Sequence, residues 1–140
     1  MIGTILARKT VKKTFKAFNR KDLATFMSGW HDDGVFIYPG DIAESGTYNG
    51  KENVTKWFRN MMEKFDSINF EVKNICLENS FDFIGTNTIA VHWDLTLVNL
   101  SGRKGVNSGV SIIKINKGKT MMIKDYIFDL GDNFRKNWGN

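Results

Sequence analysis

The start of the chain carries apolar side chains at the spacing of an amphipathic helix. Val11, Phe15 and Phe18 recur at intervals of four and three residues, with lysines on the opposite face. That periodicity predicts a helix over residues 4–20. A second, short helix is expected over residues 22–26, because the aspartate at its start can accept a hydrogen bond from the first turn.

The next segment passes from a strand pattern to a helix pattern. Residues 33–39 predict a strand that ends at Pro39, which has no N–H group to donate to a sheet. A loop with a short extended piece follows. After Gly50 an apolar stripe predicts a third helix to about residue 65, and the stripe consists of Val54, Trp57, Phe58, Met61 and Phe65.

From residue 68 onward the pattern has the period of two that is typical of strands. Four strands are expected, over residues 68–79, 86–98, 106–116 and 120–129. Helices followed by a meander of strands indicate an α+β fold. We expect a cone-shaped, strongly curved antiparallel sheet wrapped over three helices, with a pocket at its mouth. A single domain over residues 1–140 is expected, with a tail of uncertain order at 131–140.

Positive charge is concentrated at the start of the chain. The formal net charge is +5, and residues 1–21 hold seven cations and no acid, which leaves −2 for the remainder. The basic character therefore belongs to the first helix. We expect a solvated helix face there rather than a phosphate-binding surface, because no aromatic side chains alternate with its exposed lysines. A nucleic-acid partner is not expected, and such binding would show steep salt dependence.

Several absences limit the class of protein. No run of about 18 apolar residues is present, so no membrane span is expected. The N-terminal charges follow a very short apolar stretch, which is the reverse of a signal peptide, so a cytoplasmic protein is expected.

Cys76 is the only cysteine, and its apolar neighbours predict burial. No cofactor or metal is expected, because Gly-rich phosphate loops and a histidine pair at i, i+4 are absent. Covalent catalysis is not expected either, because no nucleophile motif is present.

Two side chains that can transfer protons share one face of the strand at 86–98. His92 and Asp94 stand at even positions, whereas Trp93 and the other large apolar residues stand at odd positions. Period two keeps His92 and Asp94 together. Their face is either the wet side of the sheet, with the odd positions in the core, or the wall of a pocket.

A third carboxyl group lies on the last predicted strand. Asp125 shares its face with Met121, Ile123 and Ile127, and a carboxylate among such neighbours has a raised pKa. The alternative is a surface aspartate paired with Lys124. Aromatic and apolar residues near the cone complete the candidate site, each of which could equally be ordinary core: Phe26, Trp30, Tyr38, Tyr48, Trp57 and Met61.

Three short motifs occur in the order and spacing of a known superfamily. The stretches "WHDDGVFIYPG", "GTYNGKENVTKWF" and "GKTMMIKDYIFD" resemble the first strand, third helix and last strand of the nuclear-transport-factor-2-like superfamily. This superfamily includes SnoaL-like cyclases, ketosteroid isomerases and limonene-epoxide hydrolases. The resemblance covers about 110 residues and implies the curved cone and its pocket. The superfamily hosts enzymes, binders and assembly domains, so the fold alone does not give function.

The resemblance also implies site residues. His92-Trp93-Asp94 falls where limonene-epoxide hydrolases carry Arg-x-Asp, and Asp125 falls at their last-strand aspartate. SnoaL-like cyclases carry their base roughly where Asp125 lies. Ketosteroid isomerases place an aspartate where this chain has Tyr38. In these families the even face of the long strand lines the cone and the odd face packs on a second subunit, so we expect His92 and Asp94 in the pocket and a homodimer.

The resulting hypothesis is a small-molecule enzyme that uses general acid–base chemistry. Asp125 is expected to be the base, with Asp94 or His92 as the acid or hydrogen-bond donor. The ligand is expected to be apolar, with a few rings or a terpene-like skeleton. The alternative is a non-catalytic binding or dimeric assembly module of the same fold, which the loss of the bridging arginine at His92 favours.

Overall fold

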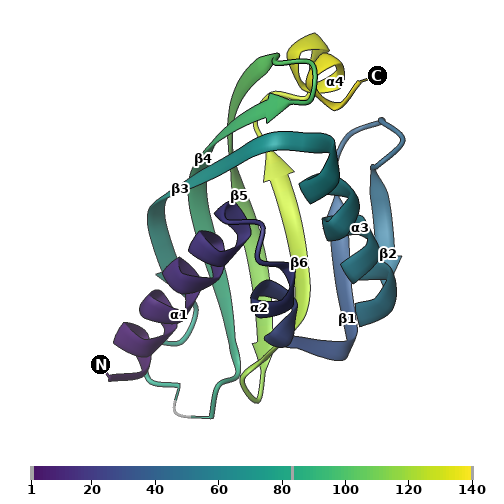
Figure 1. The fold of residues 1–140 in the computed structure, drawn as a ribbon. Coiled ribbons are helices and arrows are strands. Elements are labelled where there is room, and N and C mark those ends of the chain that lie inside the picture. The colour runs from purple at the N-terminus through teal and green to yellow at the C-terminus, as the bar shows by residue number, and fades with distance from the viewer. Residues whose placement is uncertain (1, 83, 140) are drawn as a thin grey trace.

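One six-stranded sheet, in the order β2-β1-β6-β5-β4-β3, forms the centre of the molecule (Figure 1). The computed structural model describes residues 2–82 and 84–139. The strands are β1 (Trp30–Tyr38), β2 (Gly46–Asn49), β3 (Phe65–Leu77), β4 (Asn87–Asn99), β5 (Lys104–Asn116) and β6 (Lys119–Ile127). The helices are α1 (Ile2–Asn19), α2 (Leu23–Ser28), α3 (Lys51–Lys64) and α4 (Asp132–Trp138).

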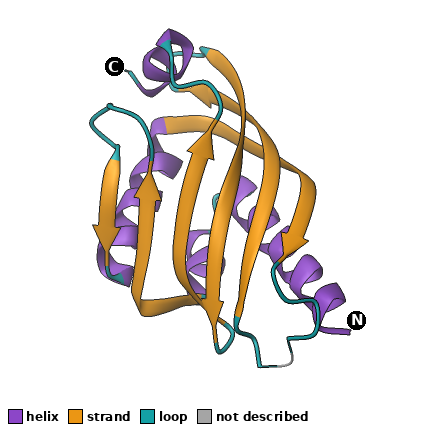
Figure 2. Ribbon diagram, turned by 180° about the vertical axis from the view of Figure 1, so that it is seen from behind, coloured by secondary structure: helices purple, strands orange, loops and turns teal. Residues whose placement is uncertain are grey.

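Helices α1, α2 and α3 cover one face of the curved sheet, and the opposite face carries no helix (Figure 2). Each of the two longer helices turns its apolar stripe to the sheet: Val11 and Phe18 of α1 are buried, as are Val54 and Trp57 of α3. The lysines of α1 remain outside, as the amphipathic pattern predicts. The α+β class and the curved sheet over three helices are therefore confirmed.

The sheet is mixed rather than antiparallel throughout. Strands β3, β4, β5 and β6 form the expected antiparallel meander. Strand β1, however, runs parallel to β6, with Phe36 opposite Ile123. The chain reaches β6 from β1 only after passing through α3 and the meander, so a hairpin does not dictate the direction of this pair.

The alternation on β4 shows which of its faces is internal. Ile89, Val91, Trp93, Leu95 and Leu97 are all buried in the core. The expectation that this apolar row packs against a second subunit is wrong, because the row faces the helices. Only the odd positions can fill that space without burying charge.

The C-terminal tail is an ordered helix that closes one end of the cone. In α4, Phe134 and Trp138 are buried, and Trp138 packs edge-on against Phe65 with ring centroids 4.9 Å apart. Arg135 is paired with Asp41 at 2.8 Å. The helix lies at the end of the sheet opposite the β5–β6 turn (Figure 1). Within the described residues, no helix has the length and apolar character needed to span a membrane.

Candidate functional site

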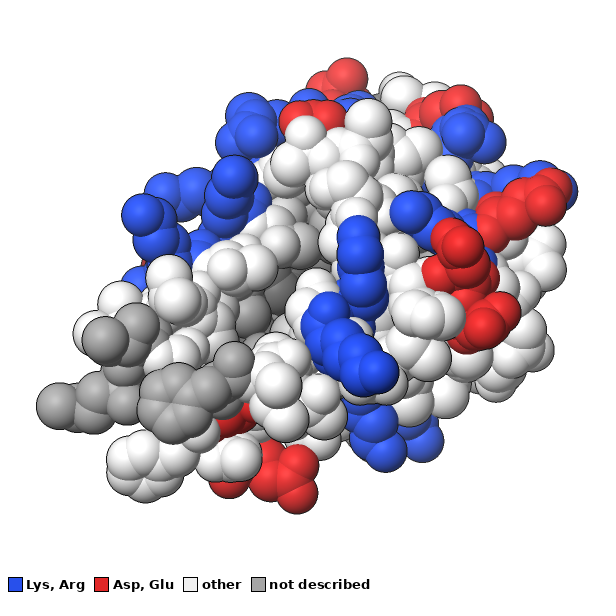
Figure 3. Space-filling model, turned by 90° about the horizontal axis from the view of Figure 1, so that it is seen from below, with Lys and Arg blue, Asp and Glu red and all other residues white. Residues whose placement is uncertain are grey.

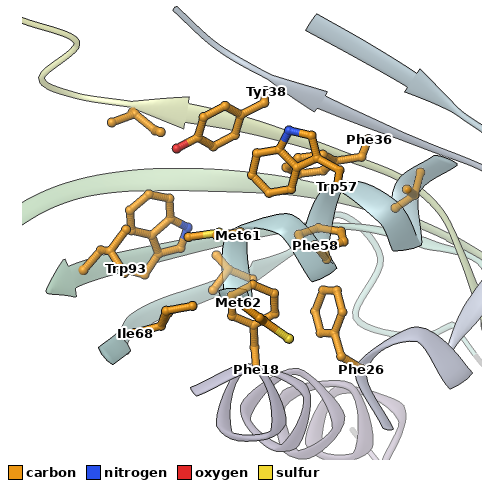
Figure 4. Close-up of a cluster of buried hydrophobic side chains, with 14 of the residues drawn as sticks. Phe18, Phe26, Phe36, Tyr38, Trp57, Phe58, Met61, Met62, Ile68 and Trp93 are labelled. Carbon is orange, nitrogen blue, oxygen red and sulfur yellow. The ribbon is translucent and has the colours of Figure 1, made fainter. Parts of the chain in front are cut away.

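A cavity of about 270 Å³ lies between the three helices and the inner face of the sheet. Aromatic side chains from several elements converge on it, as Figure 4 shows for Phe18 of α1, Phe26 of α2 and Phe58 of α3. The volume is near the lower end of the range of roughly 300–1,000 Å³ typical of small-molecule sites. The apolar wall is formed by Val11, Phe15, Phe18, Phe26, Trp30, Phe36, Tyr38, Trp57, Phe58, Met61, Phe70, Trp93, Leu95, Ile113, Ile115, Ile123 and Ile127.

The mouth of the cavity lies at the end of the cone away from α4. Figure 3 shows it as a hollow between white surfaces, with Lys and Arg side chains on both sides. Its lining residues come from α1, α2 and the β5–β6 turn and are small or polar: Thr10, Lys13, Thr14, Thr25, Ser28, Gly29, Gly118 and Thr120. The cavity is thus apolar inside and polar at its edge.

Among the described residues that line the cavity, Asp125 has the only carboxyl group. It stands on β6 between Ile123 and Ile127, which line the same wall. The residue is partly accessible and forms part of the cavity wall. The carboxyl is therefore exposed to a ligand in an otherwise apolar chamber.

A buried hydrogen-bond chain holds this carboxyl from behind. The Ser111 hydroxyl donates to Oδ1 of Asp125 at 2.6 Å, and the Trp93 indole N–H donates to Oγ of Ser111 at 2.9 Å. An indole nitrogen can only donate, so Ser111 accepts from Trp93 and points its own proton at Asp125. Since Oδ1 accepts this bond, Oδ2 is the oxygen left to carry a proton or meet a ligand.

Gly109 makes the Trp93 contact possible. It lies opposite Trp93 in the β4–β5 pair. A Cβ at this position would come within 2.6 Å of the Trp93 ring and 2.4 Å of a backbone oxygen. Any larger residue would displace the indole, so this glycine allows Trp93 to lie across β5 and reach Ser111.

The electrostatics of the cavity favour a protonated Asp125 at acidic pH. Burial raises the pKa of Asp125 from its ordinary 3.8 to about 7, against the opposing effect of the Ser111 hydrogen bond. A carboxyl with a pKa near neutrality can both take up and release a proton under physiological conditions.

Tyr38 supplies a second polar group to the cavity. Its hydroxyl accepts a hydrogen bond from the Trp138 indole at 3.1 Å. Burial raises the pKa of Tyr38, and the nearby Asp125 charge raises it further. The group therefore stays protonated. No acceptor for its proton lies within hydrogen-bond distance in the described part of the chain, which leaves that proton available to a ligand.

His92 and Asp94 do not face the cavity, contrary to expectation. They lie on the outer face of β4, because the odd positions fill the core. His92 contacts Asn74 at 3.0 Å, and Asp94 accepts a hydrogen bond from Ser108 at 2.7 Å and lies 3.6 Å from Lys73. The Ser108 hydrogen bond and the Lys73 charge lower the pKa of Asp94. The two residues are together, as period two requires, but on the opposite side of the sheet from Asp125.

Most of the expected lining residues stand in the cavity wall. Phe26, Trp30, Tyr38, Trp57 and Met61 all line it. The exception is Tyr48, whose hydroxyl donates to the Glu44 carbonyl and which lines a shallow polar hollow beside α3 instead. Cys76, expected to be buried, is exposed on β3 opposite Ala90.

Sequence reasoning missed the residues behind Asp125. Ser111 is the one hydroxyl at an inward position of an apolar strand, between Gly109 and Ile113. That isolated polar residue was a usable signal. Trp138 gave no such signal, because only the packing of α4 brings it to Tyr38.

Within the described residues, no three His, Cys, Asp or Glu side chains gather in a way that could hold a metal ion.

A family model for the SnoaL-like domain matches residues 11–121. The chain belongs to the SnoaL-like family. The match runs from the middle of α1 to the start of β6, so it includes most of the elements that form the cavity and ends before Asp125. No protein among the curated ones matches this SnoaL-like chain in sequence.

Solved structures share the fold of this SnoaL-like domain at low identity. Bal32a, from a soil-derived mobile gene cassette, is 16% identical with a TM-score of 0.79, over 94% of this chain and 95% of that one. A protein of Novosphingobium aromaticivorans, provisionally named a scytalone dehydratase, is 13% identical with a TM-score of 0.77, over 94% and 91%. TerC, co-crystallised with polyporic acid, is 17% identical with a TM-score of 0.67, over 90% and 89%. At these identities the likeness shows the fold alone.

Proposed function

We propose that this protein is a small-molecule enzyme in which Asp125 transfers a proton to or from an apolar ring compound held in the cone. The observation that carries the proposal is a lone carboxyl with a pKa of about 7 in an aromatic cavity. Catalytic groups with perturbed pKa values cluster in such pockets. Last-strand aspartates serve as the base in the SnoaL-like cyclases that the sequence resembles.

The geometry supports the following division of roles. Oδ2 of the ionised Asp125 takes a proton from a C–H bond beside a carbonyl group. The electron pair of that bond moves toward the carbonyl oxygen, where the Tyr38 O–H can donate to the developing negative charge. The protonated Asp125 then returns the proton at another position. Ser111 and the Trp93 N–H take no part in the proton transfer; they keep Oδ1 occupied.

The names of structural neighbours support a small organic ligand. One neighbour was co-crystallised with polyporic acid, and another carries a dehydratase name. A ring compound of this general kind suits a cavity lined by Phe, Trp and Tyr side chains, because aromatic walls bind flat apolar ligands well.

The test is turnover of a panel of ring ketones and epoxides by the wild type, Asp125→Asn and Asp94→Asn. We expect Asp125→Asn to lose at least about 100-fold in rate with its fold intact, as for removal of a general acid–base group. Asp94→Asn, which removes a carboxyl on the outer face, should retain wild-type turnover. Unchanged turnover in Asp125→Asn would contradict the assignment.

A second candidate function is ligand binding without catalysis. It is favoured because His92 and Asp94 lie outside, so the described lining contains no second carboxyl or histidine to work with Asp125. In that case panel compounds should bind the wild type and Asp125→Asn alike, with no product formed by either.

We also propose that two copies pair through the bare face of the sheet. This face exposes large apolar side chains, with Val106 61%, Tyr126 48% and Phe128 64% accessible. Phe128 packs near the His92 ring at a centroid distance of 6.0 Å. Contiguous exposed apolar side chains of this kind often mark protein interfaces.

A further inference from the structure

The basic face of α1 contributes to the mouth of the cavity. Lys13 is the one cation among the described residues that line it. Its neighbours in the lining, Thr10 and Thr14, come from the same side of α1. The positive charge that the sequence concentrates in residues 1–21 therefore reaches the edge of an apolar chamber.

A second ammonium group stands at the same mouth, on the β5–β6 turn. Lys119 donates from Nζ to the backbone oxygen of Ser28 at 3.1 Å, and Ser28 lines the mouth. Its neighbours Gly118 and Thr120 are also lining residues. The hollow is accordingly flanked by basic side chains on both sides (Figure 3).

Neither ammonium group forms an ion pair with a carboxylate of the described residues. The ion pairs of the described residues involve other cations, including Lys56, Lys64 and Lys73. Unpaired charge of one sign at the edge of a low-dielectric hollow focuses the electrostatic potential and attracts ligands of opposite charge. The single negative group of the cavity, Asp125, lies inside it.

We propose that the ligand is an amphipathic organic anion. Its apolar ring system occupies the aromatic cavity, and its anionic group, a carboxylate or another oxyanion, rests between Lys13 and Lys119. This inference rests on the proposed function, because it concerns the same cavity. The arrangement also orients the ligand: the Asp125 charge repels an anion from the inner end, so the reacting carbon points to Asp125 and the anionic group points out.

The experiment compares 2-naphthoate with 2-naphthamide by isothermal titration calorimetry at about pH 6, below the pKa of about 7 of Asp125. The two probes share their rings and differ in charge. Wild type should bind the naphthoate about fivefold or more tightly than the amide, with a preference that weakens as salt is added. Lys13→Gln and Lys119→Gln should each reduce that preference, and the double variant should abolish it.

Lys12→Gln is the matched control. It removes the same charge from an exposed position of α1 that does not line the cavity, so the preference for naphthoate should persist. Equal binding of the two probes to wild type, or a preference that survives in the double variant, would overturn the anion inference alone. Binding of neither probe would overturn it together with the proposed cavity ligand.

Discussion

One carboxyl oxygen of Asp125 is held by a chain of two hydrogen bonds. The Trp93 indole fixes the Ser111 hydroxyl as a donor, and Ser111 in turn occupies Oδ1. Oδ2 is thereby left as the oxygen that carries the exchangeable proton of Asp125. Two buried residues thus determine which oxygen of Asp125 stays free of the protein's own hydrogen bonds.

Asp125→Asn should change how stability depends on pH. Between about pH 4 and 7, the folded wild type holds a proton on Asp125 that the unfolded chain releases. The free energy of unfolding therefore falls as pH rises through this window. At about pH 8 the variant should be more stable than wild type by up to ~4 kcal/mol, since each pKa unit is worth about 1.4 kcal/mol.

Urea denaturation at about pH 4 and pH 8 measures this difference. At the lower pH both side chains are neutral, so the two proteins should have similar unfolding free energies. A constant difference between them at both pH values would contradict a raised pKa for Asp125.

Ser111→Ala should raise the pKa of Asp125 further, because it removes the hydrogen bond that opposes burial. It also leaves the Trp93 N–H without its partner, at a cost of about 1–3 kcal/mol in unfolding free energy. The pKa can be followed by NMR of the carboxyl carbon. Ser108→Ala, which removes the donor to Asp94 on the outer face, serves as the control and should leave the Asp125 titration unchanged.

Periodicity predicts which residues share a face but not which face is inside. It placed His92 with Asp94 correctly and gave the face shared by Ile123, Asp125 and Ile127. The apolar content of the odd positions of β4 indicates that they point inward, whereas the family resemblance implies the even positions. The difference shows that burial of five large apolar side chains determines strand orientation more strongly than the position of a motif.

At the level of elements, α4 packs against aromatic residues that line the cavity. Trp138 contacts the rings of Tyr38, Trp57 and Phe65. Lys64 donates to the Trp138 carbonyl at 3.4 Å. A helix of seven residues is too short to be stable alone, so these contacts hold it in place.

Trp138→Phe and Trp138→Ala should separate the two contributions of this indole. The phenylalanine variant keeps most of the packing and loses the hydrogen bond to Tyr38, which should lower the unfolding free energy by about 1 kcal/mol. The alanine variant also loses the packing and should cost about 3–5 kcal/mol. Equal destabilisation of both variants in urea denaturation would show that packing contributes little.

Most elements were predictable because each depends on a local pattern. The three helices over the sheet and the four-strand meander follow from periods of 3.6 and 2, with ends displaced by a few residues. Strand β1 begins at Trp30 rather than residue 33 because Trp30 pairs with Thr120 across the sheet. That pairing, its parallel direction and the docking of α4 depend on contacts between distant segments, which no local pattern contains.

At the level of the whole molecule, the two faces of the sheet have different environments. The inner face is covered by helices (Figure 2). On the outer face Val106, Tyr126 and Phe128 are exposed. A second copy placed on this outer face would bury them without blocking the mouth of either cavity, because the mouth lies between α1, α2 and the β5–β6 turn.

The double variant Tyr126→Lys/Phe128→Lys should therefore be monomeric. Sedimentation equilibrium at micromolar concentration should give twice the mass of one chain for wild type and the mass of a single chain for the variant. Leu100→Lys changes another exposed apolar residue, 72% accessible in the β4–β5 loop, and should remain dimeric. A monomeric wild type would refute the pairing.

The closure of the cone by α4 has a consequence for the proposed reaction. At the end of the chamber away from the mouth, the Tyr38 ring lines the wall and is backed by Phe134 and Trp138. We therefore expect the chamber to release its contents along the path by which they arrived. Reactant and product then compete for the same passage and cannot occupy it together. Accumulating product should therefore inhibit the reaction competitively, so that added substrate reverses the inhibition. Product release is then expected to limit the turnover rate.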